Sequence, residues 1–163
     1  MVISGFEHNA VTRPLHALGA RRQVAGRKLF DWEDTLREWD AALSKGVDAA
    51  IFTHVSNVFG YILPVQQMAE LCRKCGVPFI VDAAQSAGTQ TVSLSSLGAD
   101  FIAMPGHKGL LGPQGTGILL CGGTAMPLMQ GGTGSESLLQ DAGITYSKVY
   151  QRSDAGTVQE VAR

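Results

Sequence analysis

The sequence has few charged residues, few cysteines and no long apolar run. Charged residues make up 17% of the 163 residues, with 13 basic against 14 acidic side chains, and no basic cluster extends beyond Arg21-Arg22 and Arg27-Lys28. This balance excludes the basic surface that binds nucleic acid or anionic membrane. No apolar run reaches membrane-spanning length, and the N-terminus lacks the charged-then-apolar layout of a signal peptide. The sequence therefore predicts a cytoplasmic protein that binds neither nucleic acid nor membrane.

The three cysteines are too few and of the wrong number for a disulfide framework in a chain of this size. Cys72 and Cys75 form a C-x-x-C motif, but no second pair completes a zinc site. The motif lies in a helical pattern that begins at Met68. We therefore expect two ordinary helix residues and no metal.

The composition, with 45% hydrophobic residues, is that of a folded domain with a buried core. Apolar runs and helical periodicity predict strands at 1–4, 48–53, 78–81, 101–104 and 118–121, a weaker strand at 21–25, and helices at 11–18, 31–45, 64–75 and 94–97. The helix over 31–45 is expected to bury Trp32 and Trp39. Continuous apolar strands that alternate with helices predict an α/β fold, with a mainly parallel sheet covered by helices on both faces.

Polar side chains follow three of the predicted strands. The strand over 48–53 is followed by His54, Ser56 and Asn57, the strand over 78–81 by Asp82 and Gln85, and the strand over 101–104 by His107 and Lys108. Ligands of open α/β sheets bind beyond the carboxyl ends of the strands. We therefore expect these three groups at one edge of the sheet, an arrangement that also fits a nucleotide-binding domain.

The stretch from Ala103 to Gly117 holds five glycines and two prolines, and His107 and Lys108 are its basic residues. Glycine lets backbone approach a ligand closely. An amine that is kept away from bulk water loses part of its proton affinity and becomes a nucleophile toward a carbonyl group. The stretch therefore fits a placed Lys108. A surface turn with a solvated lysine is the alternative.

Asp82 ends a predicted buried strand, between Val81 and Ala83. A carboxylate in such a place needs a cationic partner. Pyridoxal phosphate offers a protonated pyridine nitrogen, and its aldehyde needs a lysine, so Asp82 and Lys108 match the two ends of that cofactor. Aspartate also caps helical turns readily, and capping of the following turn is an equally good interpretation.

Three motifs together resemble the class V aminotransferase family of fold-type I pyridoxal phosphate enzymes, and most of all its cysteine desulfurases and selenocysteine lyases. They are residues 53–58 (Thr-His-Val-Ser-Asn-Val), 81–88 (Val-Asp-Ala-Ala-Gln-Ser-Ala-Gly) and 106–117 (Gly-His-Lys-Gly-Leu-Leu-Gly-Pro-Gln-Gly-Thr-Gly). Each is weak alone, but their order and separation make them specific together. The resemblance runs from Ile3 to about Thr157. A dinucleotide-binding module is excluded because no Gly-x-Gly-x-x-Gly follows a strand.

The resemblance implies roles for four residues around the cofactor ring. Lys108 would carry the cofactor as a Schiff base and move protons at the substrate α-carbon. Asp82 would pair with the ring nitrogen and keep the ring an electron sink. Gln85 would hydrogen-bond the phenolate oxygen of the ring, with Asn57 close by.

Further residues are assigned by the same resemblance. His8, the second predicted catalytic residue, would stack on the ring, and His107 would contact the cofactor phosphate. Thr157, which ends the segment 152–157 (Arg-Ser-Asp-Ala-Gly-Thr), would reach the phosphate of a partner subunit, which implies a homodimer with shared active sites. His54 and His16 are expected to be ordinary loop and helix residues.

The sequence departs from the family pattern in places. Pro105 stands where many desulfurases carry a hydroxyl residue, so one phosphate contact is expected to be missing, and Val158-Gln159 replaces the usual Pro-Asn. The phosphate loop, the arginine that binds the substrate carboxylate and the persulfide-forming cysteine are expected outside these residues. We therefore interpret residues 1–163 as a partial cofactor-binding large domain, incomplete at both ends, without the N-terminal segment and the C-terminal small domain.

The implied function is that of a pyridoxal phosphate-dependent cysteine desulfurase, which removes sulfur from L-cysteine and yields alanine and an enzyme-bound persulfide. Its partners would be a small amino-acid substrate and a sulfur-acceptor protein. Another class V aminotransferase or lyase that acts on an amino acid is one alternative. A catalytically inactive cofactor-domain fragment is the other, because loss of the phosphate loop removes backbone donors that anchor the phosphate.

Overall fold

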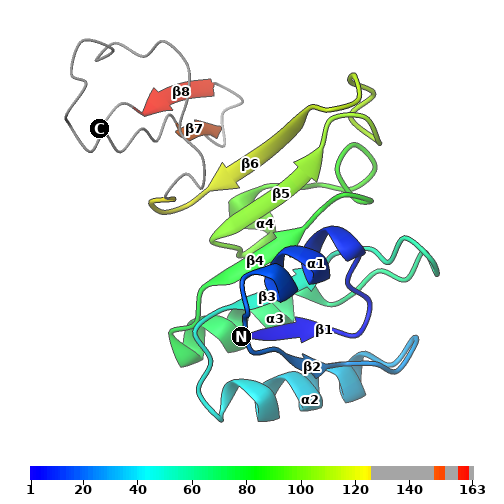
Figure 1. Cartoon of the computed structure of the whole chain (residues 1–163), viewed down its shortest axis with the longest axis vertical. Helices are drawn as coiled ribbons and strands as arrows, with labels where there is room; N and C mark the ends of the chain where they lie inside the picture. The colour runs from blue at the N-terminus through cyan, green and yellow to red at the C-terminus, as the bar shows by residue number, and fades with distance from the viewer. Residues whose placement is uncertain (126–148, 153–157, 162–163) are drawn as a thin grey trace.

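The computed structural model describes residues 1–125, 149–152 and 158–161, and its main unit is a six-stranded sheet with the order β2-β1-β3-β4-β5-β6 (Figure 1). The strands are β1 (Val2–Ser4), β2 (Gln23–Ala25), β3 (Ala50–Thr53), β4 (Phe79–Asp82), β5 (Phe101–Pro105) and β6 (Gly117–Cys121). Neighbouring strands from β2 to β5 are parallel, and β6 is antiparallel to β5. A separate pair, β7 (Val149–Arg152) and β8 (Val158–Val161), is antiparallel. The predicted mainly parallel sheet is confirmed.

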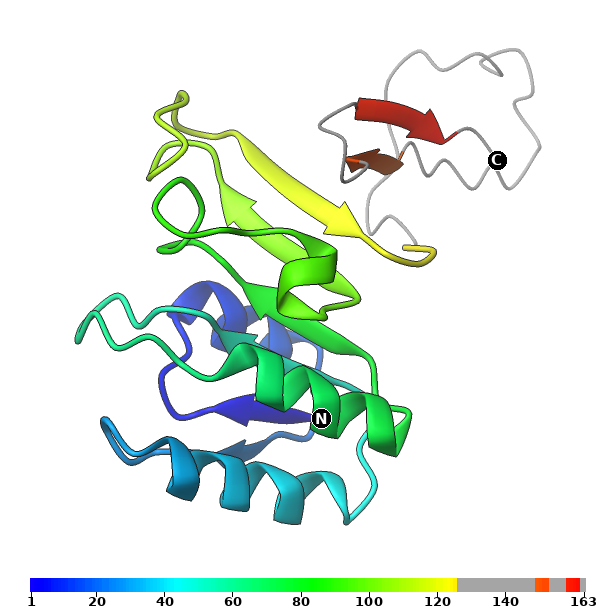
Figure 2. The ribbon, with the colours of Figure 1, turned by 180° about the vertical axis from the view of Figure 1, so that it is seen from behind.

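Helices cover both faces of the sheet, as predicted. Helix α1 (Asn9–Ala17) lies on one face, whereas α2 (Trp32–Leu43), α3 (Val65–Cys75) and α4 (Leu94–Leu97) lie on the other (Figures 1 and 2). Successive strand residues point to opposite faces, so a strand contributes side chains to the hydrophobic core on each face of the sheet. Phe52 packs in the larger core with the α2 and α3 side chains, and its neighbour Ile51 packs in the smaller core with Leu15 of α1.

An aromatic cluster forms the centre of the larger core. Trp39 of α2 is 0% exposed, and its ring meets those of Phe52 and Phe79 edge to face, with centroid separations of 5.0 and 6.4 Å. Trp32 was predicted to be a core residue of the same helix, and this prediction is wrong, because Trp32 is 45% exposed. It lies at the first turn, where its indole N–H donates a hydrogen bond to the carbonyl oxygen of Ile62 (3.1 Å).

Local sequence signals explain where the helices begin and end. His8 precedes α1, and its Nδ1 accepts a hydrogen bond from the Ala10 N–H (3.0 Å). Asp31 caps α2 in the same way through the Asp34 N–H (2.9 Å). Gly76 ends α3 with a φ of 66°, a left-handed conformation that glycine adopts without a Cβ clash. No helix in the described part of the chain is long and apolar enough to cross a bilayer.

The registers of the central strands bring their carboxyl ends to one edge. Thr53 of β3 pairs with Asp82 of β4, which pairs with Ala103 of β5. Backbone hydrogen bonds continue past the strand ends, from the His54 N–H to the Asp82 carbonyl oxygen (2.9 Å). Because the connection from β5 to β6 is short and contains no helix, the chain reverses direction there instead of crossing over to form a parallel strand. The loop in this connection carries Lys108.

We predict that the two tryptophans of α2 contribute very unequally to stability. Trp39→Ala should lower the free energy of unfolding by roughly 3–5 kcal/mol, because it removes a fully buried aromatic side chain and leaves a cavity. Trp32→Ala is the matched control and should cost about 1 kcal/mol, the net value of one exposed hydrogen bond. Urea unfolding of the two variants measures both values. Equal losses would contradict the assigned core.

Candidate functional site

A cavity of about 880 Å³ opens between α1 and the face of the sheet that α1 covers. His8, Asp82, His107 and Lys108 all line it, so four residues singled out from the sequence meet in one place. Its remaining walls are largely apolar and come from α1 and the strands: Val11, Leu15, Ile51, Ile80, Ala84, Ala103 and Leu119 are among them. The cavity therefore combines flat apolar walls with a carboxylate, an amine and two imidazoles.

Asp82, the last residue of β4, divides its two oxygens between two tasks. Oδ1 accepts a hydrogen bond from the Ala84 N–H (2.9 Å), so aspartate does cap the turn that follows the strand. Oδ2 makes no hydrogen bond or ion pair within the described residues, although Asp82 lines the cavity. Both interpretations of Asp82 are thus compatible, because one oxygen caps the turn and the other is left for a ligand.

Lys108 reaches the same cavity from the loop after β5. Its side chain is half-buried and forms no hydrogen bond or ion pair with any residue that the structure describes. The loop turns back at this point, where the Lys108 carbonyl oxygen accepts a hydrogen bond from the Leu111 N–H (2.9 Å). An amine without a counter-ion beside a cavity is available to react with a carbonyl ligand.

Two loops cross in direct backbone contact beside Lys108. A Cβ atom built on Gly88, in the loop after β4, would lie less than 3.0 Å from the carbonyl oxygen of Gly109. A Cβ atom on Gly109 would likewise meet the carbonyl oxygen of Ala87. Gly88 also has a φ of 87°, which other residues rarely adopt. The glycines therefore let the Asp82 loop fix the position of the Lys108 loop.

His8 lies at the rim of the cavity and begins α1. Its Nδ1 accepts a hydrogen bond from the Ala10 N–H. Because Nδ1 is the acceptor, the proton of the neutral ring is on Nε2. The cap also fixes the ring at the N-terminus of α1, one wall of the cavity. His107, in the loop after β5, also lines the cavity.

Two predicted site residues are not among those that line the cavity, and a third is not described. Asn57 is exposed on the turn after β3, and Gln85 is half-buried on the turn after β4. Both follow strands that end at the site edge, but neither is part of the cavity lining among the described residues. Thr157 lies outside the described residues, so its predicted contact with a partner subunit stays a prediction.

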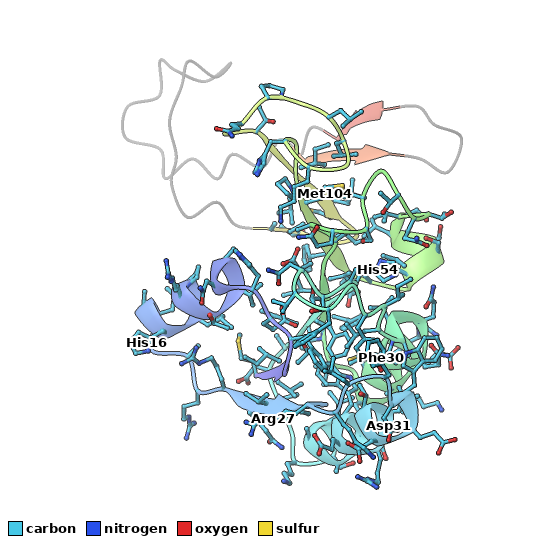
Figure 3. All side chains as sticks on the ribbon, turned by 90° about the vertical axis from the view of Figure 1, so that its right-hand side faces the viewer. His16, Arg27, Phe30, Asp31, His54 and Met104 are labelled. Carbon is cyan, nitrogen blue, oxygen red and sulfur yellow. The ribbon has the colours of Figure 1, made fainter. Side chains whose placement is uncertain are left out.

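His54 is not the ordinary loop residue that the sequence predicted, because it is only 5% exposed. Its N–H donates to the Asp82 carbonyl oxygen, and its own carbonyl oxygen accepts the Leu63 N–H (both 2.9 Å). Burial lowers the pKa of its imidazole, which favours the neutral ring. In Figure 3 His54 lies on the α3 and α4 side of the sheet, whereas His16 lies on α1 at the opposite side.

Glu7, which interacts with Asp82, is a residue that the sequence patterns did not indicate. Its Oε1 accepts hydrogen bonds from the Ser4 hydroxyl group and from the Thr53 N–H (2.7 Å). Its Oε2 is buried without a hydrogen-bond partner in the described part of the chain. Burial is the main cause that raises the pKa of Glu7 to about 7, and the charge of Asp82 adds to it. The available signal was an acid directly before His8, at the end of an apolar strand.

The cysteines are placed as the helical pattern predicted. Cys72 is buried in α3 and Cys75 is exposed at its end. Burial raises the pKa of the Cys72 thiol to about 11, so this thiol stays protonated at neutral pH. The described residues contain no cluster of histidine, cysteine and acidic side chains that could hold a metal ion.

The fold defines a class of protein. A mainly parallel mixed sheet with helices on both faces is the fold of the fold-type I pyridoxal phosphate enzymes, to which similar solved structures belong. The sequence profile of the family Aminotransferase class-V matches residues 1–162. The chain therefore belongs to the class V aminotransferase family.

Its similar proteins include several named as cysteine desulfurases. A probable cysteine desulfurase of Methanothermobacter thermautotrophicus is 40% identical over 110 residues, which cover 65% of this chain and 27% of that protein. Probable cysteine desulfurase 2 of Mycobacterium leprae is 33% identical and covers 96% of this chain and 38% of the relative. The apo structure of the cysteine desulfurase from Thermococcus onnurineus NA1 matches with a TM-score of 0.63 at 33% identity, covering 72% of this chain and 30% of that one. The chain thus spans well under half the length of these relatives.

We predict that Gly88→Ala displaces the Lys108 loop. The added methyl group would collide with the backbone of Gly109, so amide NMR signals of residues 106–112 should shift. Gly46→Ala is the matched control, because Gly46 has a similar φ of 77° but open space around it. The control should cost only about 1 kcal/mol of backbone strain and leave those signals in place. Unchanged signals in Gly88→Ala would refute the crossing as the positioning contact.

We also predict that Glu7 lowers the free energy of unfolding by an amount that depends on pH. The folded state binds the Glu7 proton more tightly than the unfolded state, with a pKa of about 7 against 4.5. This loss of stability is therefore absent below pH 4.5, where both states are protonated. It grows as pH rises to about 7 and then stays at about 3 kcal/mol. Glu7→Gln keeps the acceptor oxygen but cannot ionise, so it should gain stability over wild type as pH rises from 5 to 8.

The control for this measurement is Glu38→Gln. Glu38 also accepts a backbone hydrogen bond, from the Gly26 N–H (2.6 Å), but lies on α2 away from the cavity. Its stability difference from wild type should change little between pH 5 and 8. A pH-independent difference between Glu7→Gln and wild type in urea unfolding would contradict the buried acid.

Proposed function

We propose that this chain forms part of the cofactor-binding domain of a pyridoxal phosphate-dependent cysteine desulfurase. The observation that carries the proposal is the shared cavity of Asp82 and Lys108, a carboxylate oxygen and an amine that have no partner among the residues described. Lys108 would bind the aldehyde, and Asp82 would pair with the ring nitrogen. Bound there, pyridoxal phosphate supplies an electron sink for negative charge at the α-carbon of an amino acid.

The residues around the cavity fit that group. A volume of about 880 Å³ falls in the range of small-molecule sites, and Ile80, Ala84 and Ala103 provide apolar walls for a flat ring. His8 is proposed to stack on the ring from the α1 side and His107 to contact the phosphate. Gln85 and Asn57 are proposed to contact the phenolate oxygen from the neighbouring strand ends.

The proposed substrate is L-cysteine, on the strength of the relatives named as cysteine desulfurases. Lys108 would take the α-proton of cysteine and later return a proton to the product. The C–S bond breaks, the sulfur passes to a thiol of the enzyme as a persulfide, and alanine leaves. That thiol is proposed to lie outside residues 1–163, since Cys72 stays protonated in the core.

The assembly around this domain is also proposed. Because the chain spans 27% and 38% of two relatives, we propose that an N-terminal segment and a C-terminal small domain complete the site in a longer protein. A homodimer with shared active sites through Thr157, transfer of sulfur to an acceptor protein and a cytoplasmic location stay predictions.

We predict that pyridoxal phosphate labels Lys108 selectively. After incubation with the cofactor and reduction with borohydride, peptide mapping should find the adduct on Lys108. Lys108→Ala should lower labelling at least about tenfold, because no other lysine of the described residues lines the cavity with Asp82. Lys45→Ala, at an exposed lysine after α2, is the control and should label as wild type does. Equal labelling of all lysines would refute the site and favour an inactive fragment.

Product analysis separates the enzyme classes in the longest available form of the protein. With L-cysteine as substrate, a desulfurase forms alanine and releases sulfide when a reductant is present. A transaminase instead forms the keto acid of its amino-acid substrate. Keto acid without alanine would overturn the desulfurase proposal but leave the cofactor site standing.

A further inference from the structure

Glu7 is not among the residues that line the cavity, and the proposed chemistry does not use it. It follows β1 and precedes His8, which lines the cavity. Its Oε1 is held by the Ser4 hydroxyl group and by the Thr53 N–H (2.7 Å), so it connects the carboxyl ends of β1 and β3. Its Oε2 is buried and has no hydrogen-bond partner among the described residues. Such an oxygen is expensive to leave charged.

The sheet register places this carboxyl group near Asp82. Thr53, which donates to Glu7, is the register partner of Asp82 on the adjacent strand. Around Glu7, β1 presents the Ser4 hydroxyl group, β3 the Thr53 amide and β4 the Asp82 carboxylate. Asp82 is the titratable group that acts on Glu7, and no basic side chain of the described residues forms an ion pair with either acid. Two neighbouring carboxyl groups without a cation do not both ionise readily.

We propose that Glu7 is a positioning residue that acts through Asp82. While Asp82 has no cationic partner, repulsion from its carboxyl group makes Glu7 hold its proton more tightly. When a protonated ring nitrogen pairs with Asp82, Glu7 releases its proton to solvent and supplies a second negative charge behind Asp82. This inference rests on the proposed function, because the cation is the ring nitrogen of pyridoxal phosphate.

The consequence concerns the proton on the ring nitrogen. A single carboxylate holds that proton by one hydrogen bond and one charge, whereas a second ionised carboxyl group behind it adds a longer-range attraction. Glu7 is not among the residues that line the cavity, so it is no catalytic residue. It would set how firmly Asp82 keeps the ring in its cationic form.

The first test needs no cofactor. Carbon-13 NMR of the glutamate side-chain carboxyl groups follows the Glu7 titration, and Glu7→Gln assigns its signal by removing it. The midpoint should lie near pH 7 in wild type. In Asp82→Asn it should fall by roughly 0.5 pH unit or more, because the repelling charge is gone. A wild-type midpoint below pH 5, or the same midpoint in both proteins, would overturn the coupling.

The second test measures cofactor affinity against pH. Pyridoxine 5′-phosphate lacks the aldehyde, so its binding is reversible and independent of Lys108 chemistry. Wild type and Glu7→Gln should bind it equally at pH 5.5, where Glu7 holds its proton. At pH 8.5 wild type should bind several-fold more tightly. Glu38→Gln is the control and should match wild type at both pH values.

The outcomes separate this inference from the proposed function. A loss of affinity in Glu7→Gln that is the same at both pH values would mean a structural role only and overturn the inference. If neither protein, in the longest available form of the chain, bound the cofactor analogue, the proposed function would fail. The NMR midpoints would still decide whether the two carboxyl groups are coupled.

Discussion

The site depends on the contact between two loop backbones at the carboxyl edge of the sheet. The strand register alone places Asp82, because β4 lies between β3 and β5 with every backbone partner fixed. Lys108 lies beyond the end of β5, where no ladder holds it. The contact of Gly88 with Gly109 supplies the missing constraint, since neither backbone can move toward the other. Two glycines without side chains thus determine the distance between an amine and a carboxylate that the sequence separates widely.

The charges of the site are arranged for a ligand. Asp82 uses one oxygen to cap its own turn and keeps the other, and Lys108 has no counter-ion in the described part of the chain. An amine and a carboxylate that line one cavity without forming an ion pair leave both groups to pair with something else. A ligand with a cationic nitrogen at one end and an aldehyde near the other satisfies both groups at once.

Local patterns predicted the elements well, and tertiary context decided what they missed. The apolar run before Asp82 and the amphipathic stretch before Gly76 gave β4 and α3 within one or two residues, because periodicity and glycine caps act locally. The exposure of Trp32 and the burial of His54 depend on which segments pack over them, and no window of sequence contains that information. The motifs led to the Asp82 and Lys108 cavity, but Asn57 and Gln85 came by resemblance and lie outside its lining.

Glu7 shows why sequence patterns underrate such residues. An acid beside a histidine in a loop suggests a solvated side chain. Here two strand ends bury the carboxyl group, and one of its oxygens has no hydrogen-bond partner in the part of the chain that the structure describes. A buried acid costs stability above its pKa, and a neutral glutamine would keep the same hydrogen-bond acceptor without that cost. Perturbed acids of this kind concentrate at functional sites, where a change of charge is useful. We therefore interpret the loss of folding stability caused by Glu7 as the consequence of placing a second ionisable group near Asp82.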